Sequence, residues 1–246
     1  MKSIILAAGM GSRLRPLTFS VPKCLVPVAD KPILEYQINA LSRAGIKDIT
    51  IVIGYLGDLV ISFVRKWMQE NENNQVNVSF IENPFHRTTN NMYSLYLARN
   101  EFYGRSFILL NGDVVLSEEI IRNLVLNKEN DLVCVDTSVF FEESMKVTID
   151  ENGYISNISK SISREMAYGV SIDVYKFSDE SSKLLLDMVV QIVEQEKNLR
   201  EWTEVAMQRL FYEGKLKMRP YDIKGLKWFE VDTPEDLEAA NVLFKV

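Results

Sequence analysis

The chain has few of the residues on which disulfide-stabilised and thiolate-metal proteins depend. It contains two cysteines, Cys24 and Cys134, and their spacing does not match a metal site, so we expect two reduced thiols. Long apolar runs are also missing, because a stretch such as Ser3 to Ala8 falls far short of the roughly 20 residues that span a bilayer. The sequence therefore predicts neither a disulfide framework nor a transmembrane helix.

A basic surplus and a signal peptide are absent as well. The net charge of −6 argues against nucleic acid as a partner, since nucleic-acid-binding proteins usually carry excess positive charge. The N-terminus has no charged region followed by a long apolar segment and a cleavage site, so we expect a cytoplasmic protein with no membrane partner. What is present is a hydrophobic content of 47% over 246 residues, which is enough to bury a core as one domain.

Strand and helix patterns alternate through the first 136 residues. Apolar runs predict strands at 2–8, 49–53, 76–81, 107–110 and 132–135, and helical spacing predicts helices at 33–44, 59–68, 92–98 and 117–126. Such alternation is typical of a mostly parallel sheet with helices on both faces. The predicted fold class is therefore α/β and Rossmann-like.

The pattern changes after Asp136. Short strand patterns joined by turns, at 146–150, 154–159 and 169–177, predict a small antiparallel extension. Helices are predicted at 179–194 and 202–212, strands near 215–219 and 227–231, and a last helix is opened by Thr233-Pro234. Since no repeat or linker interrupts the chain, we expect a single domain over 1–246.

A glycine-rich segment, Gly9–Leu14, follows the first predicted strand, as in dinucleotide-binding loops. Two details oppose that interpretation: Leu14 stands where the third glycine belongs, and Pro16 prevents a regular helix. Arg13 and Arg15 suit a triphosphate better, because glycines let backbone N–H groups approach phosphate oxygens while guanidinium groups supply charge. For this segment alone, a solvated loop with surface arginines remains the alternative.

Two aspartates stand beyond later strands. Asp113 follows the strand predicted at 107–110, and Asp232 follows the one near 227–231. Open α/β sheets bind ligands at the carboxyl ends of their strands, and Mg²⁺ needs only one or two carboxylates when phosphates and water complete its shell. Both are therefore candidate ligands for Mg²⁺. A turn position for Asp113 and a place in the helix cap of Thr233 for Asp232 are the alternatives.

Taken together, seven segments resemble the signature of the nucleotidyltransferase family that activates sugar phosphates and related molecules. Within that family the resemblance is closest to the short bacterial phosphocholine cytidylyltransferase type. It implies Mg²⁺, an NTP that is usually CTP, transfer of CMP with release of pyrophosphate, and an acceptor such as phosphocholine, a phosphonate, a polyol phosphate or a phosphoamino acid such as phosphoglutamine. The segments are Leu6–Thr18, Pro22–Val28, Lys31-Pro32, Val52–Leu56, Asn90–Leu95, Asn111–Asp113 and Trp228–Thr233.

The resemblance also implies roles on the nucleotide side. Arg13 and Lys23 are the catalytic candidates, which would hold the β and γ phosphates or stabilise the transition state, and Asp113 and Asp232 would hold the metal. The remaining candidates would meet the base, ribose and phosphates. The full nucleotide-binding set is Leu6, Ala7, Ala8, Gly9, Gly11, Ser12, Arg13, Tyr55 and Asn90.

On the acceptor side, residues 137–212 are expected to contribute the subregion that binds the second substrate. Trp202, with acids on either side, could hold a cationic amine through ring-face and charge contacts, or it could be a core residue with solvated neighbours. Lys146 could bind the acceptor phosphate or be a surface lysine, and Asn90 and Asn91 could simply cap a helix. The acceptor candidates are Asn91, Lys146, Tyr168, Trp202 and Glu204. The single histidine, His86, is assigned no role.

Other functions remain open at this point. The first is a sugar-1-phosphate nucleotidyltransferase that uses UTP, GTP or dTTP. The second is a nucleotide-sugar-dependent glycosyltransferase, which usually has an Asp-x-Asp element, whereas Asn111 stands two residues before Asp113. The third is a non-catalytic nucleotide-binding module, which the intact set of basic and acidic candidates disfavours. A homo-oligomer is possible, and the acceptor cannot be named from the sequence.

Overall fold

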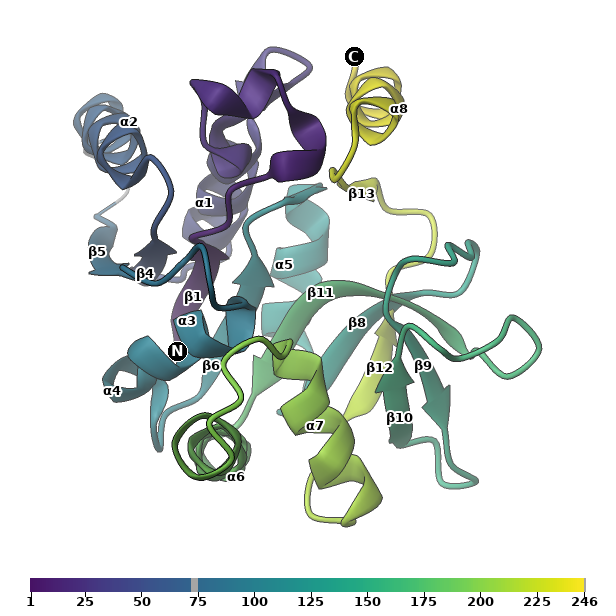
Figure 1. Ribbon diagram of the computed structural model, residues 1–246. Helices are drawn as coiled ribbons and strands as arrows, with labels where there is room; N and C mark the ends of the chain where they lie inside the picture. Colours follow the sequence, from purple (N-terminus) through teal and green to yellow (C-terminus); the bar gives the residue numbers. More distant parts are fainter. Residues whose placement is uncertain (72–74, 246) are drawn as a thin grey trace.

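The computed structural model describes residues 1–71 and 75–245 and is built around one nine-stranded sheet (Figure 1). The strands are β1 (Lys2–Ala7), β4 (Asp48–Ile53), β5 (Asn77–Glu82), β6 (Phe107–Asn111), β8 (Leu132–Asp136), β9 (Lys146–Ile149), β10 (Ile155–Ser159), β11 (Gly169–Phe177) and β12 (Arg219–Asp222). The order is β10-β9-β11-β6-β1-β4-β5, and β8 lies between β11 and β12.

The sheet has a parallel part and an antiparallel part. β1 pairs in parallel with β4 and β6, and β4 pairs in parallel with β5, so that Leu6 stands beside both Val52 and Asn111. β11 runs antiparallel to β6, β8 and β9. The parallel α/β half and the antiparallel extension that the sequence predicts are therefore both confirmed. One predicted strand is displaced: β12 lies at Arg219–Asp222 rather than near 215–219.

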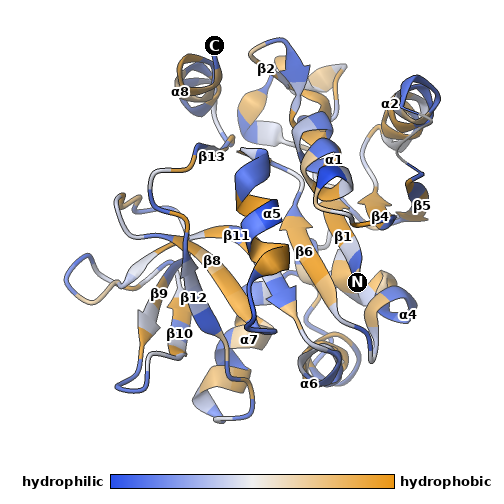
Figure 2. Ribbon diagram, turned by 180° about the vertical axis from the view of Figure 1, so that it is seen from behind, coloured by the Kyte–Doolittle hydropathy of each residue, from blue (hydrophilic) through white to orange (hydrophobic). Residues whose placement is uncertain are grey.

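Helices cover both faces of the sheet (Figures 1 and 2). One face carries α1 (Ile33–Arg43), α2 (Gly57–Glu70) and α5 (Glu118–Leu126), and the other carries α3 (Asn91–Leu97), α4 (Arg99–Phe102), α6 (Asp179–Val190) and α7 (Thr203–Tyr212). Side chains of β1 alternate between the two cores. Ile4 and Leu6 pack in the core beneath α3, α4, α6 and α7, and Ile5 packs in the core beneath α1, α2 and α5. A strand buried on both faces needs an unbroken apolar run, which explains the sequence of β1.

Helix ends follow their sequence signals, with two differences. α8 (Pro234–Phe244) begins with the predicted cap, in which the Thr233 side chain and Asp236 form a capping box. Ser117 takes the N-cap position of α5 but makes no side-chain cap bond. The helix predicted at 179–194 ends as an α-helix at Val190 and continues as a π-helical turn, η5 (Gln191–Gln195). Within the described residues, no helix has the length and apolar character that crossing a membrane requires.

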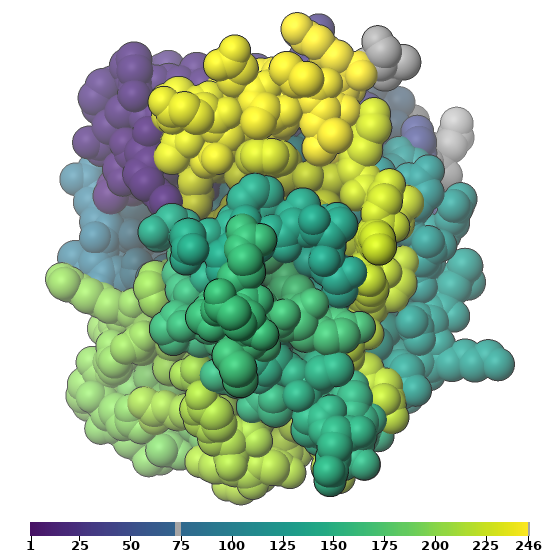
Figure 3. All heavy atoms as spheres, turned by 90° about the vertical axis from the view of Figure 1, so that its right-hand side faces the viewer, coloured from purple at the N-terminus to yellow at the C-terminus, as the bar shows by residue number. Residues whose placement is uncertain are grey.

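The C-terminal segment returns to the N-terminal loop. β13 (Trp228–Glu230) pairs with β7 (Val114–Leu116), and α8 packs on the hairpin of β2 (Pro27–Val28) and β3 (Lys31–Pro32). The Ala29 N–H donates to the Asn241 side chain at 2.7 Å. Figure 3 shows the C-terminal segment, in yellow, lying beside the N-terminal segment, in purple. This return brings residue 232 next to residues 13 and 23.

Candidate active site

A cleft of about 280 Å³ opens beyond the carboxyl ends of β1 and β6. It gathers most of the residues that the sequence singled out, from both ends of the chain and from its middle. Fourteen of them line it: Leu6, Ala7, Ala8, Gly9, Gly11, Ser12, Arg13, Lys23, Asn90, Asn91, Asp113, Trp202, Glu204 and Asp232. His86, for which no role is predicted, also lines the cleft.

The loop after β1 folds as three short 3-10 turns, η1 (Ser12–Leu14), η2 (Leu17–Phe19) and η3 (Lys23–Leu25). Gly11 has a φ of 58°, and a Cβ there would lie 2.9 Å from the Cβ of Lys23. The Gly11 carbonyl also accepts a bond from the Thr18 hydroxyl at 2.7 Å. Glycine at this position therefore lets Lys23 approach the loop and reach into the cleft.

Lys23 lies between the two predicted metal ligands. Its Nζ donates to Asp113 Oδ2 at 2.6 Å and to Asp232 Oδ1, and Arg13 contacts the other oxygen of Asp232 at 2.8 Å. Burial alone would lower the pKa of Lys23, but the charges of Asp113 and Asp232 outweigh burial and raise it above its usual value. The raised pKa favours the charged form of this amine, which lines the cleft.

A third carboxylate, Glu230, joins Asp113 and Asp232, and oxygen atoms of the three lie within 4.8 Å of one another. Burial, and then the charges of Asp173 and Asp113, raise the pKa of Glu230 well above its usual range. Sequence reasoning missed Glu230, although residues two apart in an extended segment point the same way, so its spacing from Asp232 was a usable signal.

These carboxylates fit a hard divalent cation. Asp113 Oδ1 is buried and has no hydrogen-bond partner among the described residues, so one ligand oxygen is free. All the donors are oxygens, which Mg²⁺ prefers. Ionising Glu230 beside Asp113 and Asp232 is unfavourable with only Lys23 and Arg13 nearby, and a bound cation would offset the added negative charge. The cluster therefore has both the donors and the charge to bind a metal ion.

The opposite wall carries a second pair of acids, Asp173 and Glu204, joined through Tyr175. The Tyr175 hydroxyl lies 3.0 Å from Asp173 Oδ1 and 2.8 Å from Glu204 Oε1. One hydroxyl proton can serve only one carboxylate, so both contacts are satisfied only when one acid is protonated. Burial, and then the charge of Glu204, raises the pKa of Asp173 to about 8, and burial likewise raises the pKa of Glu204.

A bulge aims Asp173 into the cleft. The register of β11 against β8 shifts between Ser171 and Tyr175, and Asp173, inside the bulge, has a φ of 57°. The Asn111 amide donates to Asp173 Oδ2 at 2.9 Å, which links this wall to the strand that leads to Asp113. Without the bulge, strict alternation would direct Asp173 differently, so the sequence pattern of β11 gave no sign of its place.

Asn90 and Asn91 have structural bonds as well as places on the cleft wall. Asn90 is the N-cap of α3, and its Oδ1 accepts from the Asn91 N–H at 2.8 Å. Asn91 Oδ1 accepts from the Thr203 N–H at 2.8 Å, which fastens the start of α7 to α3. Asn90 therefore caps a helix, which is the alternative considered for this pair. Asn91 instead sets where Trp202 and Glu204 stand.

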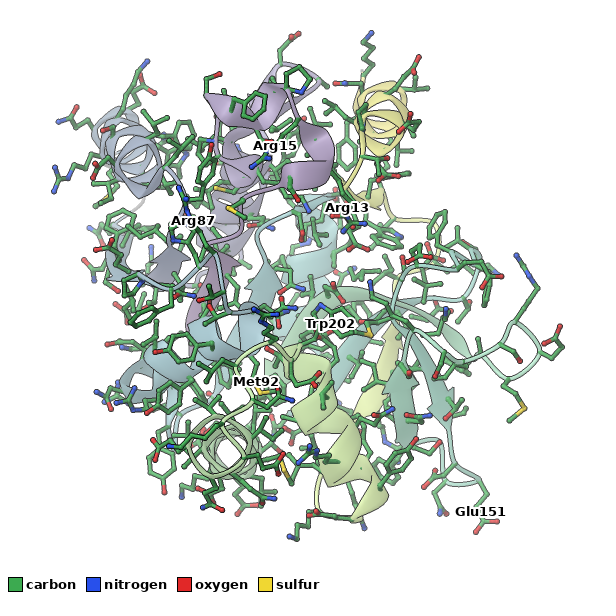
Figure 4. All side chains as sticks on the ribbon, viewed as in Figure 1. Arg13, Arg15, Arg87, Met92, Glu151 and Trp202 are labelled. Carbon is green, nitrogen blue, oxygen red and sulfur yellow. The ribbon has the colours of Figure 1, made fainter. Side chains whose placement is uncertain are left out.

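Trp202 lies at the mouth of the cleft, below Arg13 in Figure 4, and is 41% exposed, whereas Glu204 is 2% exposed. Glu204 is therefore not part of a solvated helix face. The Lys160 amine lies 5.2 Å from the centre of the Trp202 ring. Among the described residues that line the cleft, the arginine and lysine side chains are those of Arg13, Lys23 and Lys160, and Lys160 is the one beside Trp202.

Three predicted positions need correction, because the structure places them outside the cleft lining. Lys146 is fully buried, and its Nζ donates to the Glu142 carbonyl at 2.7 Å, so it is neither an acceptor ligand by position nor a surface lysine. Tyr168 is exposed and is not among the residues that line the cleft. The Tyr55 hydroxyl donates to the Phe19 carbonyl at 3.2 Å, so Tyr55 supports the loop rather than lining the cleft.

Comparisons with known proteins agree with this geometry. Residues 2–244 match the family model described as nucleotidyl transferase. CTP:phosphoglutamine cytidylyltransferase of Campylobacter jejuni is 29% identical, over 97% of this chain and 98% of that protein. Choline-phosphate cytidylyltransferase of Streptococcus pneumoniae is 41% identical, over 50% of this chain and 49% of that protein.

A solved structure resembles the whole fold. The CTP:phosphocholine cytidylyltransferase of Streptococcus pneumoniae superimposes with a TM-score of 0.78 and 24% sequence identity, covering 99% of both chains. At this identity the likeness is one of fold.

Proposed function

Because the chain belongs to the nucleotidyl transferase family, we propose that it is a cytidylyltransferase that transfers CMP from CTP to a small phosphorylated metabolite and releases pyrophosphate. The observation that carries the proposal is the ion-paired group in the cleft, where Lys23 lies between Asp113 and Asp232 directly beneath the glycine-rich loop. The choice of CTP is supported by the activities named for the relatives from Campylobacter jejuni and Streptococcus pneumoniae.

The reaction needs alignment and charge rather than a protein nucleophile. An oxygen of the acceptor phosphate attacks the α-phosphorus of CTP, the new P–O bond forms in line with the bond that breaks, and pyrophosphate leaves with the electron pair. Arg13 and Lys23 would hold the β and γ phosphates, where negative charge collects. The backbone from Ala7 to Gly11 would meet the base and ribose, since glycine permits close approach.

Asp113 and Asp232, with Glu230 beside them, would hold Mg²⁺, which when bound offsets the negative charge of the triphosphate. In that arrangement Lys23, which contacts both aspartates, would offset the repulsion between them. Nucleoside triphosphates are kept inside cells, so the proposed reaction also favours the cytoplasm as the place of work.

For the acceptor we propose a phosphorylated metabolite that carries a cationic amine. The Trp202 ring face and the buried pair Asp173 and Glu204, which keeps one negative charge when one acid is protonated, form a wall that suits an ammonium group. Lys160 is in reach of the same wall and is the candidate for the acceptor phosphate, the role that Lys146 cannot take from its buried position. A cation here would also relieve the repulsion between Asp173 and Glu204.

The test is a pyrophosphate-release screen of ATP, CTP, GTP and UTP, with dTTP added, against five acceptors in the presence of Mg²⁺. The acceptors are phosphocholine, 2-aminoethylphosphonate, phosphoglutamine, inositol phosphate and glucose 1-phosphate. We expect the highest kcat/KM with CTP and an amine-bearing acceptor. The same assay on Asp113→Asn serves as the inactive control, and Lys66→Met, on the exposed face of α2, serves as the active one.

Two results would oppose the proposal in different ways. Turnover confined to UTP, GTP or dTTP with glucose 1-phosphate would assign the chain to the sugar-phosphate branch of the family. Wild-type turnover by Asp113→Asn, with CTP or any other nucleotide, would remove the metal role from this carboxylate.

A further inference from the structure

Gln37 of α1 reaches the turn that carries Asp113. Its side chain is completely buried, and its Nε2 donates to two backbone carbonyls, those of Asn111 at 2.7 Å and Val114 at 2.9 Å. These carbonyls stand at the two ends of the Asn111–Val114 turn between β6 and β7. One side chain thus spans the turn whose third residue is Asp113.

The chemistry of the contact requires an amide. Two carbonyl oxygens cannot bond to each other, so a group with two N–H donors must lie between them. A serine or threonine hydroxyl has only one proton, and a lysine would add a buried charge close to Lys23. A flipped amide would set its oxygen against both carbonyls, so the hydrogen-bond network assigns the orientation.

The other end of the same amide is left without a partner. Gln37 Oε1 is buried and has no hydrogen-bond partner among the described residues. A buried acceptor in this state is unfavourable, so the amide is not placed there to satisfy its own hydrogen-bonding groups. The contribution of Gln37 at this position is the two hydrogen bonds that it donates to the turn.

Two further bonds hold the turn from other sides. The Gly112 N–H donates to the Leu6 carbonyl at 2.9 Å, and the Val231 N–H donates to the Asp113 carbonyl at 3.0 Å. A Cβ at Gly112 would lie 2.9 Å from the Leu6 oxygen, so the turn is pressed against β1. The Leu6 and Val231 bonds are made to the backbone between the turn's ends, and the Gln37 bonds set the distance between those ends.

We propose that Gln37 is a positioning residue that sets the Asp113 carboxylate relative to Lys23 and Asp232, and through it the affinity of the cleft for a divalent cation. The effect on turnover rests on the proposed function, whereas the effect on cation binding does not. Residues that do not bind the metal themselves but orient its ligands typically contribute about 10-fold to 100-fold to metal affinity.

The test compares Gln37→Met with Gln208→Met. Methionine has a similar length and no donor. Gln208 also donates one amide bond, to Asn157 Oδ1 at 2.8 Å, but between α7 and β10 and away from the turn. Mn²⁺ binding to each protein without nucleotide is measured by electron paramagnetic resonance, together with kcat, KM and the thermal midpoint. We expect Q37M to lose about tenfold in Mn²⁺ affinity and in kcat, with KM for the nucleotide within about twofold of wild type. For Q208M, the Mn²⁺ affinity, kcat and KM should each stay within about twofold of wild type.

Mn²⁺ affinity equal to wild type in folded Q37M would overturn the proposal, since a purely structural glutamine changes only the thermal midpoint. If Q37M does not fold, Q37E, which keeps the size and offers at most one proton, is measured against the same threshold. A fall in Mn²⁺ affinity without any CTP turnover by the wild type would leave Gln37 a positioning residue and would count against the proposed function alone.

Discussion

The two walls of the cleft are built in different ways. The wall proposed to bind the nucleotide, called the nucleotide wall, is one continuous segment, residues 6–23, in which backbone groups, Arg13 and Lys23 line the cleft. The wall proposed to bind the acceptor, called the acceptor wall, is assembled from β11 and from the start of α7, with Asp173 far in the sequence from Trp202 and Glu204. A phosphate chain common to all nucleotides can be bound by a local loop, whereas a particular acceptor requires side chains that only folding brings together.

The largest expected effect removes the charge that faces the triphosphate. In Lys23→Met, kcat should fall by about 10²-fold to 10³-fold, because a preorganised charge is lost where charge develops and the two aspartates are left to repel each other. Pyrophosphate release checks this, with circular dichroism to verify the fold and Lys66→Met as the matched lysine control. A decrease of less than tenfold in a folded variant would show that the nucleotide wall does not depend on this charge.

A smaller effect should be confined to the acceptor wall. Trp202→Ala and Glu204→Gln should each raise the KM for an amine-bearing acceptor by about tenfold, since a ring-face or charge contact with a desolvated cation is worth about 1–2 kcal/mol. The KM for CTP should remain within about twofold. Tyr212→Ala, an exposed aromatic at the end of the same helix, is the control. An equal rise in both KM values would mean that the walls are not separate.

The same wall should make stability depend on pH. The pKa of folded Asp173 is raised above its ordinary value of 3.8 to about 8, so between these values the folded state binds more protons than the unfolded state. The free energy of unfolding should therefore fall as the pH rises through that window. Asp173→Asn lacks this contribution, so its stability should not fall for this reason. The thermal midpoint of Asp173→Asn minus that of wild type should therefore increase from about pH 5 to about pH 9.

Asp187→Asn, which removes an exposed acid from α6, is the control for this series. Its difference from wild type should stay nearly constant with pH. A constant difference for Asp173→Asn as well would mean that Asp173 is not held in its protonated form by the fold.

The smallest effect on activity is expected for Lys146→Met. Its amine bonds the Glu142 carbonyl and lies outside the cleft lining, so the KM for the acceptor should change by less than about twofold. Stability should fall by about 1–2 kcal/mol, because a carbonyl loses its partner. Acceptor titrations and thermal unfolding measure the two quantities. A tenfold rise in the acceptor KM would return Lys146 to the acceptor wall.

The success of the sequence interpretation differs between the walls. Arg13, Lys23, Asp113 and Asp232 could be identified because a buried strand, a glycine-rich loop and strand ends each carry a local pattern. The burial of Lys146 was missed because a strand pattern says nothing of the loop at 137–145, where the Glu142 carbonyl accepts a bond from its amine. Asp173 was missed because a bulge changes the alternation of β11.

By itself the sequence determined the α/β order of elements, the glycine-rich basic loop after β1 and the pair of aspartates at strand ends, since each depends on hydrophobic period, glycine and charge within a short stretch. Only the tertiary structure decided that Asp173 lines the cleft, that Gln37 spans the turn of Asp113 and that Glu204 is a buried member of the cleft wall. The reason is that burial and mutual distance are properties of contacts between residues about 30 to 200 positions apart, which no local pattern encodes.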